Sequence, residues 1–169
     1  MGLSGKSIMI FGAGVNQLEL IREARQLGLT TVVIDPQEDP PGKSEADFYY
    51  CVDGNDYQTT RTIALKYRVD GIITGQMEKP LRLMTRLARE LGFIFNSPEA
   101  TERCLDKWLM KENLLGNNIP CAKGILIKPN EDIDLRLSGG MTFPLIIKPR
   151  DAFSSRGVYK CDTPGEVKS

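Results

Sequence analysis

The 169-residue sequence contains no histidine and only four cysteines. These are Cys51, Cys104, Cys121 and Cys161, and no two of them form a Cys-x-x-Cys pair. Without histidine, Ser-His and Cys-His nucleophile pairs are excluded within the chain, and a zinc site is not expected. We therefore predict no metal ligand among these residues.

The sequence also lacks a net charge and a long apolar run. Lysine plus arginine and aspartate plus glutamate both number 22, so no bulk field draws the chain to nucleic acid or to a membrane surface. No run is long enough to span a bilayer, and the N-terminus has no apolar signal core. Together with the scattered cysteines, these features predict a reduced, cytoplasmic protein without nucleic-acid or membrane partners.

Short apolar runs alternate with amphipathic helical patterns in the first part of the chain. We predict strands over residues 7–11, 31–35, 48–52, 70–74 and 93–95. Helical stripes are predicted after Gly14, from a cap at Asp56 or Thr59, and from Pro80. The order of strand, glycine turn, helix and strand indicates a right-handed βαβ unit. The predicted fold class is α/β, with a Rossmann-like parallel sheet flanked by helices.

The second part of the chain has a different pattern. Ser97 can cap a helix with Pro98 in its first turn, and a further helix is predicted over residues 106–115. Three antiparallel strands are then predicted, over residues 122–127, 145–148 and 158–160, with connections at 130–134 and 138–140. We place a domain boundary so that residues 1–97 form the first domain and residues 98–169 the second.

A basic loop of small residues follows the apolar run 145–147. Lys148 ends that run, Pro149 stops it, and the loop extends over residues 151–157. Backbone N–H groups of small residues, together with a lysine, suit a polyanion such as a row of phosphates. The alternative is an edge strand whose lysine passes a surface hairpin to reach water.

A second motif precedes this loop. The helix capped by Ser97 is followed by Asp106-Lys107 at the start of a second helix, by Ile119-Pro120 at a strand entry, and finally by the strand that ends in Lys148-Pro149. In this order the chain resembles the ATP-grasp superfamily, which includes carboxylate–amine ligases and the large chain of carbamoyl-phosphate synthase. A solvated helix lysine is the alternative reading of Lys107.

The resemblance implies roles for several residues of the second domain. Lys107 and Lys148 would contact ATP phosphates, the loop residues Ser154, Ser155 and Gly157 would cover them, and Arg156 would be a catalytic charge clamp on the transferring phosphoryl group. Within this loop only Gly157 is a glycine, fewer than in many relatives.

The resemblance also implies an activity. ATP would activate a carboxylate as an acyl phosphate, which an amine or similar nucleophile then attacks. This chain would be the front portion of such a ligase, ending in a partial α+β lobe with a small antiparallel sheet, while the magnesium ligands would lie outside it. We expect such a piece to bind ATP weakly and to be inactive alone. Its exposed apolar sheet face would lead to a homodimer or to mobility between residues 128 and 156.

Residues at the ends of the first and fourth strands are candidates for a co-substrate site. Gly12, Gly14 and Val15 follow the first strand, and Glu78 follows the fourth. Ligands of open α/β sheets gather at such strand ends, and the resemblance implies a co-substrate pocket there. Glu78 could accept a substrate amine; alternatively, it is an acid favoured by the dipole of the helix that Pro80 opens.

The sequence is also compatible with a different function, the binding of a nucleotide or dinucleotide without catalysis. Gly12 and Gly14 match two glycines of the dinucleotide fingerprint, and Asp35 stands where a ribose-binding acid could lie. Gln17 occupies the place of the third glycine. The alternative is therefore a non-catalytic nucleotide- or dinucleotide-binding domain, which a comparison of ADP with NADH binding would separate from a ligase.

Overall fold

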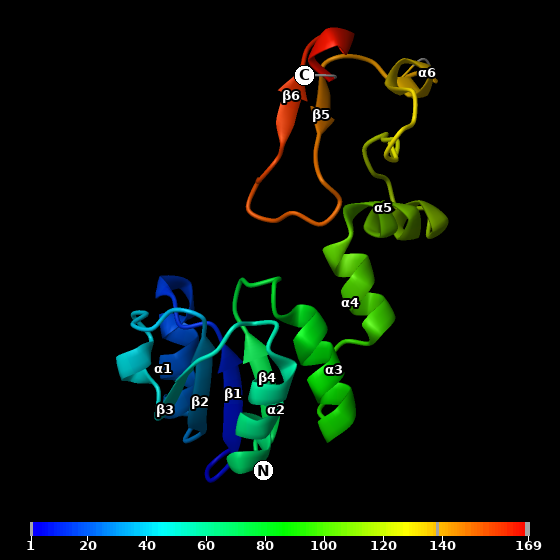
Figure 1. Ribbon diagram of the computed structural model, residues 1–169. Helices are drawn as coiled ribbons and strands as arrows, with labels where there is room; N and C mark the ends of the chain where they lie inside the picture. Colours follow the sequence, from blue (N-terminus) through cyan, green and yellow to red (C-terminus); the bar gives the residue numbers. More distant parts are fainter. Residues whose placement is uncertain (1, 138, 168–169) are drawn as a thin grey trace. The chain divides into compact units, whose positions relative to one another are not determined.

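The computed structural model describes residues 2–137 and 139–167 (Figure 1). It divides into two compact units, Met1–Thr101 and Glu102–Ser169, which are described separately below. The domain boundary predicted after residue 97 lies four residues before this division. That the two parts are separate domains stays a prediction. Among the described residues, no helix is both long and apolar enough to cross a membrane.

The first unit is built on a four-stranded parallel sheet. Its strands are β1 (Ser7–Phe11), β2 (Thr30–Asp35), β3 (Phe48–Cys51) and β4 (Gly71–Thr74), in the order β3-β2-β1-β4. Its helices are η1 (Val15–Gln17), α1 (Leu18–Gln26), η2 (Lys43–Glu45), α2 (Tyr57–Lys66) and α3 (Leu81–Leu91). The predicted parallel sheet flanked by helices is confirmed.

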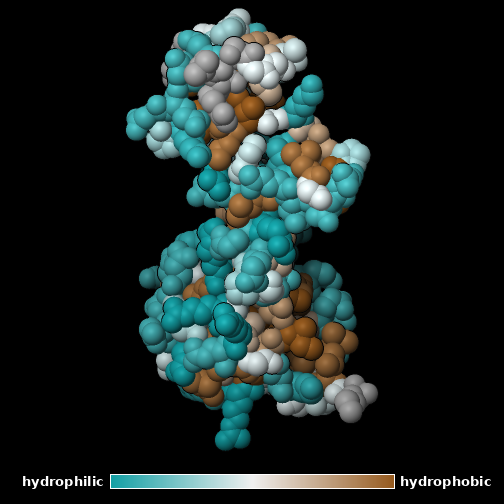
Figure 2. Space-filling model, turned by 90° about the vertical axis from the view of Figure 1, so that its right-hand side faces the viewer, coloured by the Kyte–Doolittle hydropathy of each residue, from teal (hydrophilic) through white to brown (hydrophobic). Residues whose placement is uncertain are grey.

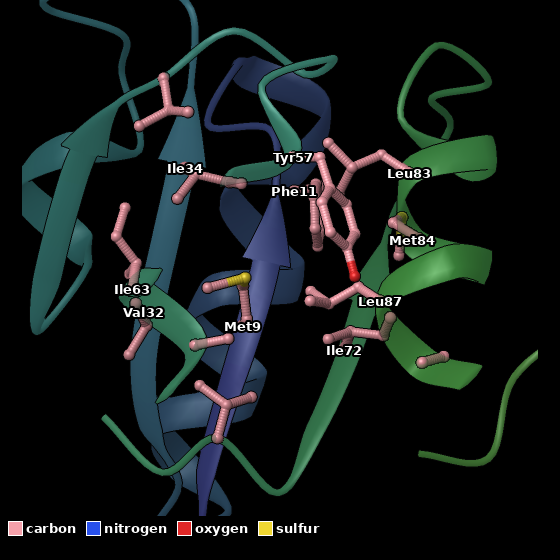
Figure 3. Close-up of a cluster of buried hydrophobic side chains, with 14 residues drawn as sticks. Met9, Phe11, Val32, Ile34, Tyr57, Ile63, Ile72, Leu83, Met84 and Leu87 are labelled. Atoms are coloured by element: carbon pink, nitrogen blue, oxygen red, sulfur yellow. The ribbon is translucent and has the colours of Figure 1, made fainter. Parts of the chain in front are cut away.

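Successive side chains of a strand point to opposite faces of the sheet, and here helices cover both faces. On one face, Met9 and Phe11 of β1 pack against α2 and α3 in the larger core cluster (Figure 3). On the other face, Ile10 packs with Ile21 and Ala24 of α1. Helices on both faces explain why β1 and β2 read as continuous apolar runs rather than as an apolar-polar alternation.

The strand order reverses at β1. The chain moves from β1 to β2 and β3 on one side and returns to place β4 on the other side of β1. The register aligns Phe11 with Thr74, and Thr74 Oγ1 donates to the Phe11 carbonyl at 2.9 Å. The loops that leave β1 and β4 therefore start side by side at the point where open α/β sheets bind ligands.

The strand predicted over residues 93–95 was wrong. Gly92 ends α3 in the left-handed conformation, and the Phe93 N–H donates to the Ala88 carbonyl at 2.9 Å. Phe93 and Phe95 pack against the larger core cluster, whereas Ile94 is fully exposed. The alternation that suggested a strand is real, but this backbone closes the end of α3 and does not pair with the sheet.

The second unit contains short elements around a hairpin. The helix α4 (Pro98–Leu105) runs into it, and α5 (Lys107–Gly116), α6 (Ile133–Leu137), β5 (Leu145–Ile147), β6 (Tyr159–Cys161) and η3 (Pro164–Val167) follow. β5 and β6 pair antiparallel, which confirms the small antiparallel sheet. The third strand predicted over residues 122–127 was wrong, because that segment has no regular secondary structure and the Ala122 carbonyl accepts from the Lys111 ammonium.

The face drawn in Figure 2 is mostly hydrophilic and carries separate hydrophobic patches. In the hairpin of the second unit, Ile146 and Tyr159 are 60% and 66% exposed. Apolar exposure of this size on a short hairpin is unfavourable in water unless something covers it. The predicted homodimer and the predicted mobility of residues 128–156 both stay predictions.

The core assignment can be tested with a leucine and an isoleucine, two side chains of the same size with opposite burial. Leu87 is fully buried in the larger core cluster, so Leu87→Ala should lower the free energy of unfolding by about 2–5 kcal/mol. Ile94 is fully exposed, so Ile94→Ala should change stability by less than about 0.5 kcal/mol. Urea unfolding followed by circular dichroism measures both; equal losses would contradict the core described here.

Candidate functional site

The second unit encloses a cavity of about 650 Å³ beside α5 and β5. Its apolar wall comes from the segment before α6 and from β5, including Ile125, Ile127, Leu145 and Ile147. Its basic side chains are Lys107, Lys111, Lys123, Lys148 and Arg150, and no carboxylate is among the described lining residues. Such a cavity suits a ligand with one flat apolar part and one multiply charged anionic part.

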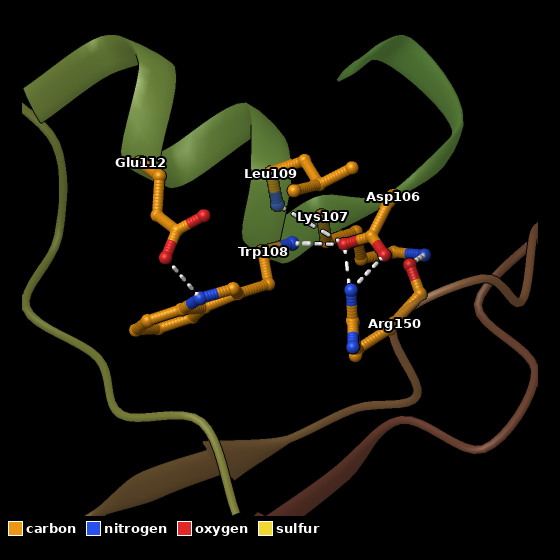
Figure 4. Close-up of polar contacts among 6 residues, drawn as sticks. All are labelled: Asp106, Lys107, Trp108, Leu109, Glu112 and Arg150. Atoms are coloured by element: carbon orange, nitrogen blue, oxygen red, sulfur yellow. Dashed lines mark hydrogen bonds and ion pairs between the residues drawn. The ribbon is translucent and has the colours of Figure 1, made fainter. Parts of the chain in front are cut away.

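Asp106 joins two segments that carry lining residues of this cavity, and Figure 4 shows its polar contacts. Its Oδ1 accepts from the N–H groups of Trp108 and Leu109 at 2.8 and 3.1 Å, which caps α5. The same carboxylate pairs with the Arg150 guanidinium, whose Nε lies 3.2 Å from Oδ1. Burial raises the pKa of Asp106, but the hydrogen bonds from Arg150 and from the helix N-terminus outweigh burial and hold that pKa below its ordinary value.

Lys107 contacts the loop that follows β5. Its backbone N–H donates to the Arg150 carbonyl at 3.0 Å, and its ammonium donates to the carbonyls of Arg150 and Ala152. The ammonium also lies 5.4 Å from the ring centre of Phe153. The structure therefore brings two of the predicted residues, Lys107 and Lys148, to one cavity, and the ammonium of Lys107 contacts the predicted phosphate loop at the Ala152 carbonyl.

Lys111 is a basic residue of the cavity that sequence reasoning missed. It lies four residues after Lys107 on α5, so both side chains lie on the same face of the helix. Its ammonium donates to the Ala122 carbonyl, and a side chain on Gly124 would come within 3.0 Å of Lys111 Cε. The i, i+4 spacing of the two lysines was the available signal.

The loop residues predicted to cover phosphates lie outside the cavity lining. Ser154, Ser155 and Gly157 all have left-handed backbones, with φ of 56°, 58° and 67°. This conformation costs on the order of 1–3 kcal/mol for each non-glycine residue and is concentrated at ligand-binding segments. Both serines and Arg156 are exposed, and the Arg156 N–H donates to the Phe153 carbonyl at 3.3 Å.

The first unit brings the predicted co-substrate residues to the strand-order reversal. Gly12 has φ of 97°, which favours glycine, and a side chain there would overlap Met77 Sδ. The Gln17 amide donates to the Gly75 carbonyl and so ties the turn after β1 to the loop after β4. Gly14 and Val15 belong to the first of these segments and Glu78 to the second. Val15 is 71% exposed and Glu78 is also exposed.

Asp35 does not favour the dinucleotide alternative. The residue is 5% exposed, and its Oδ2 accepts from the Ala13 N–H at 2.8 Å while its Oδ1 accepts from the Gln37 N–H at 2.9 Å. Because both oxygens bind backbone groups of the chain itself, this carboxylate holds the two loops together. It is not presented to a ribose hydroxyl.

No family model matches the chain, but relatives are found among known sequences and solved structures. It is 25% identical over 153 residues to the formate-dependent phosphoribosylglycinamide formyltransferase of Prochlorococcus marinus, covering 90% of this chain and 39% of that protein. The N5-carboxyaminoimidazole synthetase of Staphylococcus aureus, solved with ADP, superposes with a TM-score of 0.82 at 22% identity over 98% of this chain and 43% of that one.

A third relative is the N5-carboxyaminoimidazole synthase of Aspergillus clavatus, solved with ADP and 5-aminoimidazole ribonucleotide. It has a TM-score of 0.80 at 21% identity and covers 99% of this chain and 43% of that one. The chain has an ATP-grasp-type fold over the part that it shares with these relatives. It spans 39–43% of the length of these three relatives.

The role of Asp106 can be tested through stability and its pH dependence. Asp106→Asn keeps a capping oxygen but loses the charge facing Arg150, whereas Asp106→Ala loses both, including a cap worth about 1 kcal/mol. We therefore expect unfolding free energies in the order wild type, Asn, Ala. Because the folded-state pKa of Asp106 is lowered, its contribution is present above its ordinary value of 3.8 and is lost as pH falls through the lowered pKa.

Urea unfolding followed by the fluorescence of Trp108, the single tryptophan, measures this effect in the second unit. Asp162→Asn is the matched control, since Asp162 pairs with Lys160 at a site where both side chains are more than half exposed. A difference between wild type and Asp106→Asn that persists unchanged below the ordinary pKa would contradict the assignment.

Proposed function

We propose that this chain is the front portion of an ATP-dependent carboxylate–amine ligase, and that its second unit binds the phosphates of ATP. The observation that carries the proposal is the convergence of Lys107 and Lys148 on one cavity with five basic and no acidic side chains among its described lining residues. The apolar wall of the same cavity suits a purine. A polyphosphate gains hydrogen bonds and charge neutralisation there at once.

In the proposed reaction, a carboxylate oxygen attacks the γ-phosphorus of ATP, the bond to the β-phosphate oxygen breaks, and ADP leaves. The amine nitrogen then attacks the acyl carbon, inorganic phosphate leaves, and the nitrogen loses a proton. Lys107 and Lys148 would neutralise phosphate charge during the first step, and Arg156 would clamp the transferring group. Ser154, Ser155 and Gly157 would present backbone N–H groups after the loop closes.

ATP-dependent transfer of this kind uses magnesium to neutralise the transferring phosphoryl group. Among the described residues, no three acidic, cysteine or histidine side chains are grouped so that they could hold a metal ion. We propose that Lys107, Lys148 and Arg156 hold the phosphates, whereas magnesium would be held by ligands outside these residues.

We assign the amine co-substrate to the first unit, at Gly12, Gly14, Val15 and Glu78. The Aspergillus relative was solved with 5-aminoimidazole ribonucleotide, and the Prochlorococcus relative is named for phosphoribosylglycinamide. We propose a small amine carried on a phosphoribosyl group as the class of co-substrate. We also propose a cytoplasmic ligase, since all four cysteines are free thiols, and a homodimer that covers the exposed hairpin.

Nucleotide binding by the second unit tests the proposal directly. Calorimetric titration with ADP, ATP and NADH should show binding of the first two only. Lys148→Ala should weaken ATP binding by on the order of 1.5–3 kcal/mol, and Lys107→Ala by less, because the Lys107 ammonium exchanges existing carbonyl contacts for phosphate contacts. Lys160→Ala, on an exposed strand and outside the cavity lining, is the control. Unchanged affinity in both cavity variants would remove the phosphate assignment.

The separation of the two sites gives a further test. Gly14→Val should weaken binding of 5-aminoimidazole ribonucleotide at least about tenfold while leaving ADP affinity nearly intact. A branched side chain at Gly14 would crowd Gln17 Oε1, which lies 3.1 Å from the Cβ position, and Gln17 ties the two loops of the site together. Gly14→Ala, with no branch, should have a smaller effect. Loss of ADP binding by a folded Gly14→Val chain would show that the two ligands do not bind in separate units.

A further inference from the structure

Met77 fills the space directly over the turn that follows β1. A side chain on Gly12 would overlap Met77 Sδ, so the thioether already occupies the position that a ligand on the Gly12 backbone would take. Met77 is partly exposed, whereas Met9 and Met84 are fully buried in the core. The methionine therefore lies at the surface, over the turn after β1, and is not part of the packed interior.

The loop that carries Met77 is held in place by the two residues before it. Gly75 follows the paired strand end, its carbonyl accepts from the Gln17 amide, and a side chain on Gly75 would lie 3.4 Å from Leu20 Cδ2. Gln76 then adopts a left-handed backbone with φ of 57°, which is uncommon for a non-glycine residue. These constraints on residues 75 and 76 direct the chain so that Met77 comes to lie over Gly12.

We infer that Met77 is a specificity-determining residue for the co-substrate, because its thioether sets how large a group can reach the backbone of residues 12–14. The inference rests on the proposed co-substrate role of the first unit. It adds the residue that selects the ligand and the property selected, which is the bulk of the group placed against Gly12.

Methionine suits this task for a physical reason. Its unbranched side chain has three rotatable bonds and a polarisable sulfur, so it can move aside for a ligand and pack against it afterwards. A β-branched residue is stiff at its first torsion and could not move in the same way. Shortening the side chain should admit larger ligands, and stiffening it should exclude them.

Methyl NMR of chain labelled at the methionine methyl groups provides the direct readout. Six methionines report at once, and Met141 lines the cavity of the second unit. Saturating 5-aminoimidazole ribonucleotide should shift the Met77 methyl resonance and leave that of buried Met84 in place. ADP should shift the Met141 methyl resonance and not that of Met77.

Three variants test the selection by size. Met77→Ala should raise the affinity for 5-aminoimidazole ribonucleotide about tenfold and change that for the smaller ribose 5-phosphate by no more than about twofold. Met77→Ile should lower the affinity for the ribonucleotide by about tenfold, and Met77→Leu, unbranched at Cβ, should stay within about threefold of wild type. Unfolding curves for each variant separate these effects from a loss of fold.

Two results would overturn the inference. One is an unchanged ratio of the two affinities in a folded Met77→Ala chain. The other is failure of the ribonucleotide, at millimolar concentration, to bind or to move the Met77 methyl resonance. In either case a shift of the Met141 methyl by ADP would leave the proposed nucleotide site standing, and absence of that shift would count against the proposed function itself.

Discussion

The candidate nucleotide site depends on one carboxylate, that of Asp106. It caps α5 through two backbone N–H groups and pairs with Arg150 from the loop after β5. A helix start and a strand end far apart in the sequence are thereby held at one point. Lys107 directly follows Asp106, and Lys148 directly follows β5, two residues before Arg150, so the ion pair between Asp106 and Arg150 also brings the two lysines to the same cavity.

The first unit uses a buried carboxylate in a comparable way. Asp35 accepts from the N–H groups of Ala13 and Gln37, so the end of β2 holds the turn that leaves β1. Gln17 then joins that turn to the loop after β4. In both units a carboxylate at the end of a regular element holds a neighbouring loop, Asp35 through backbone N–H groups and Asp106 through the Arg150 guanidinium, and the loops so placed carry candidate binding residues. Buried polar groups are stable in a core only when they are satisfied in this way.

Sequence patterns were most reliable where side-chain periodicity and capping agree. The strands β1 to β4 and the capping serine Ser97 were predictable, because each rests on local chemistry, and so was a helix start at Asp56 or Thr59, of which Asp56 caps α2 in the structure. The failures were segments whose state depends on a distant partner. Residues 93–95 have strand-like alternation but no pairing, and residues 122–127 are apolar yet meet the side chain of Lys111 at their start.

By itself, the sequence determined the α/β class, the order of the elements and the pair of lysines in Asp106-Lys107 and Lys148-Pro149, since these follow from short-range patterns and motif order. Tertiary structure alone decided that Asp35 serves the chain's own backbone, that Lys111 joins the cavity and that Met77 covers Gly12. The physical reason is that a side chain's partner is chosen by packing between elements, and hydrogen-bond and contact partners many residues away leave no periodic trace in the sequence.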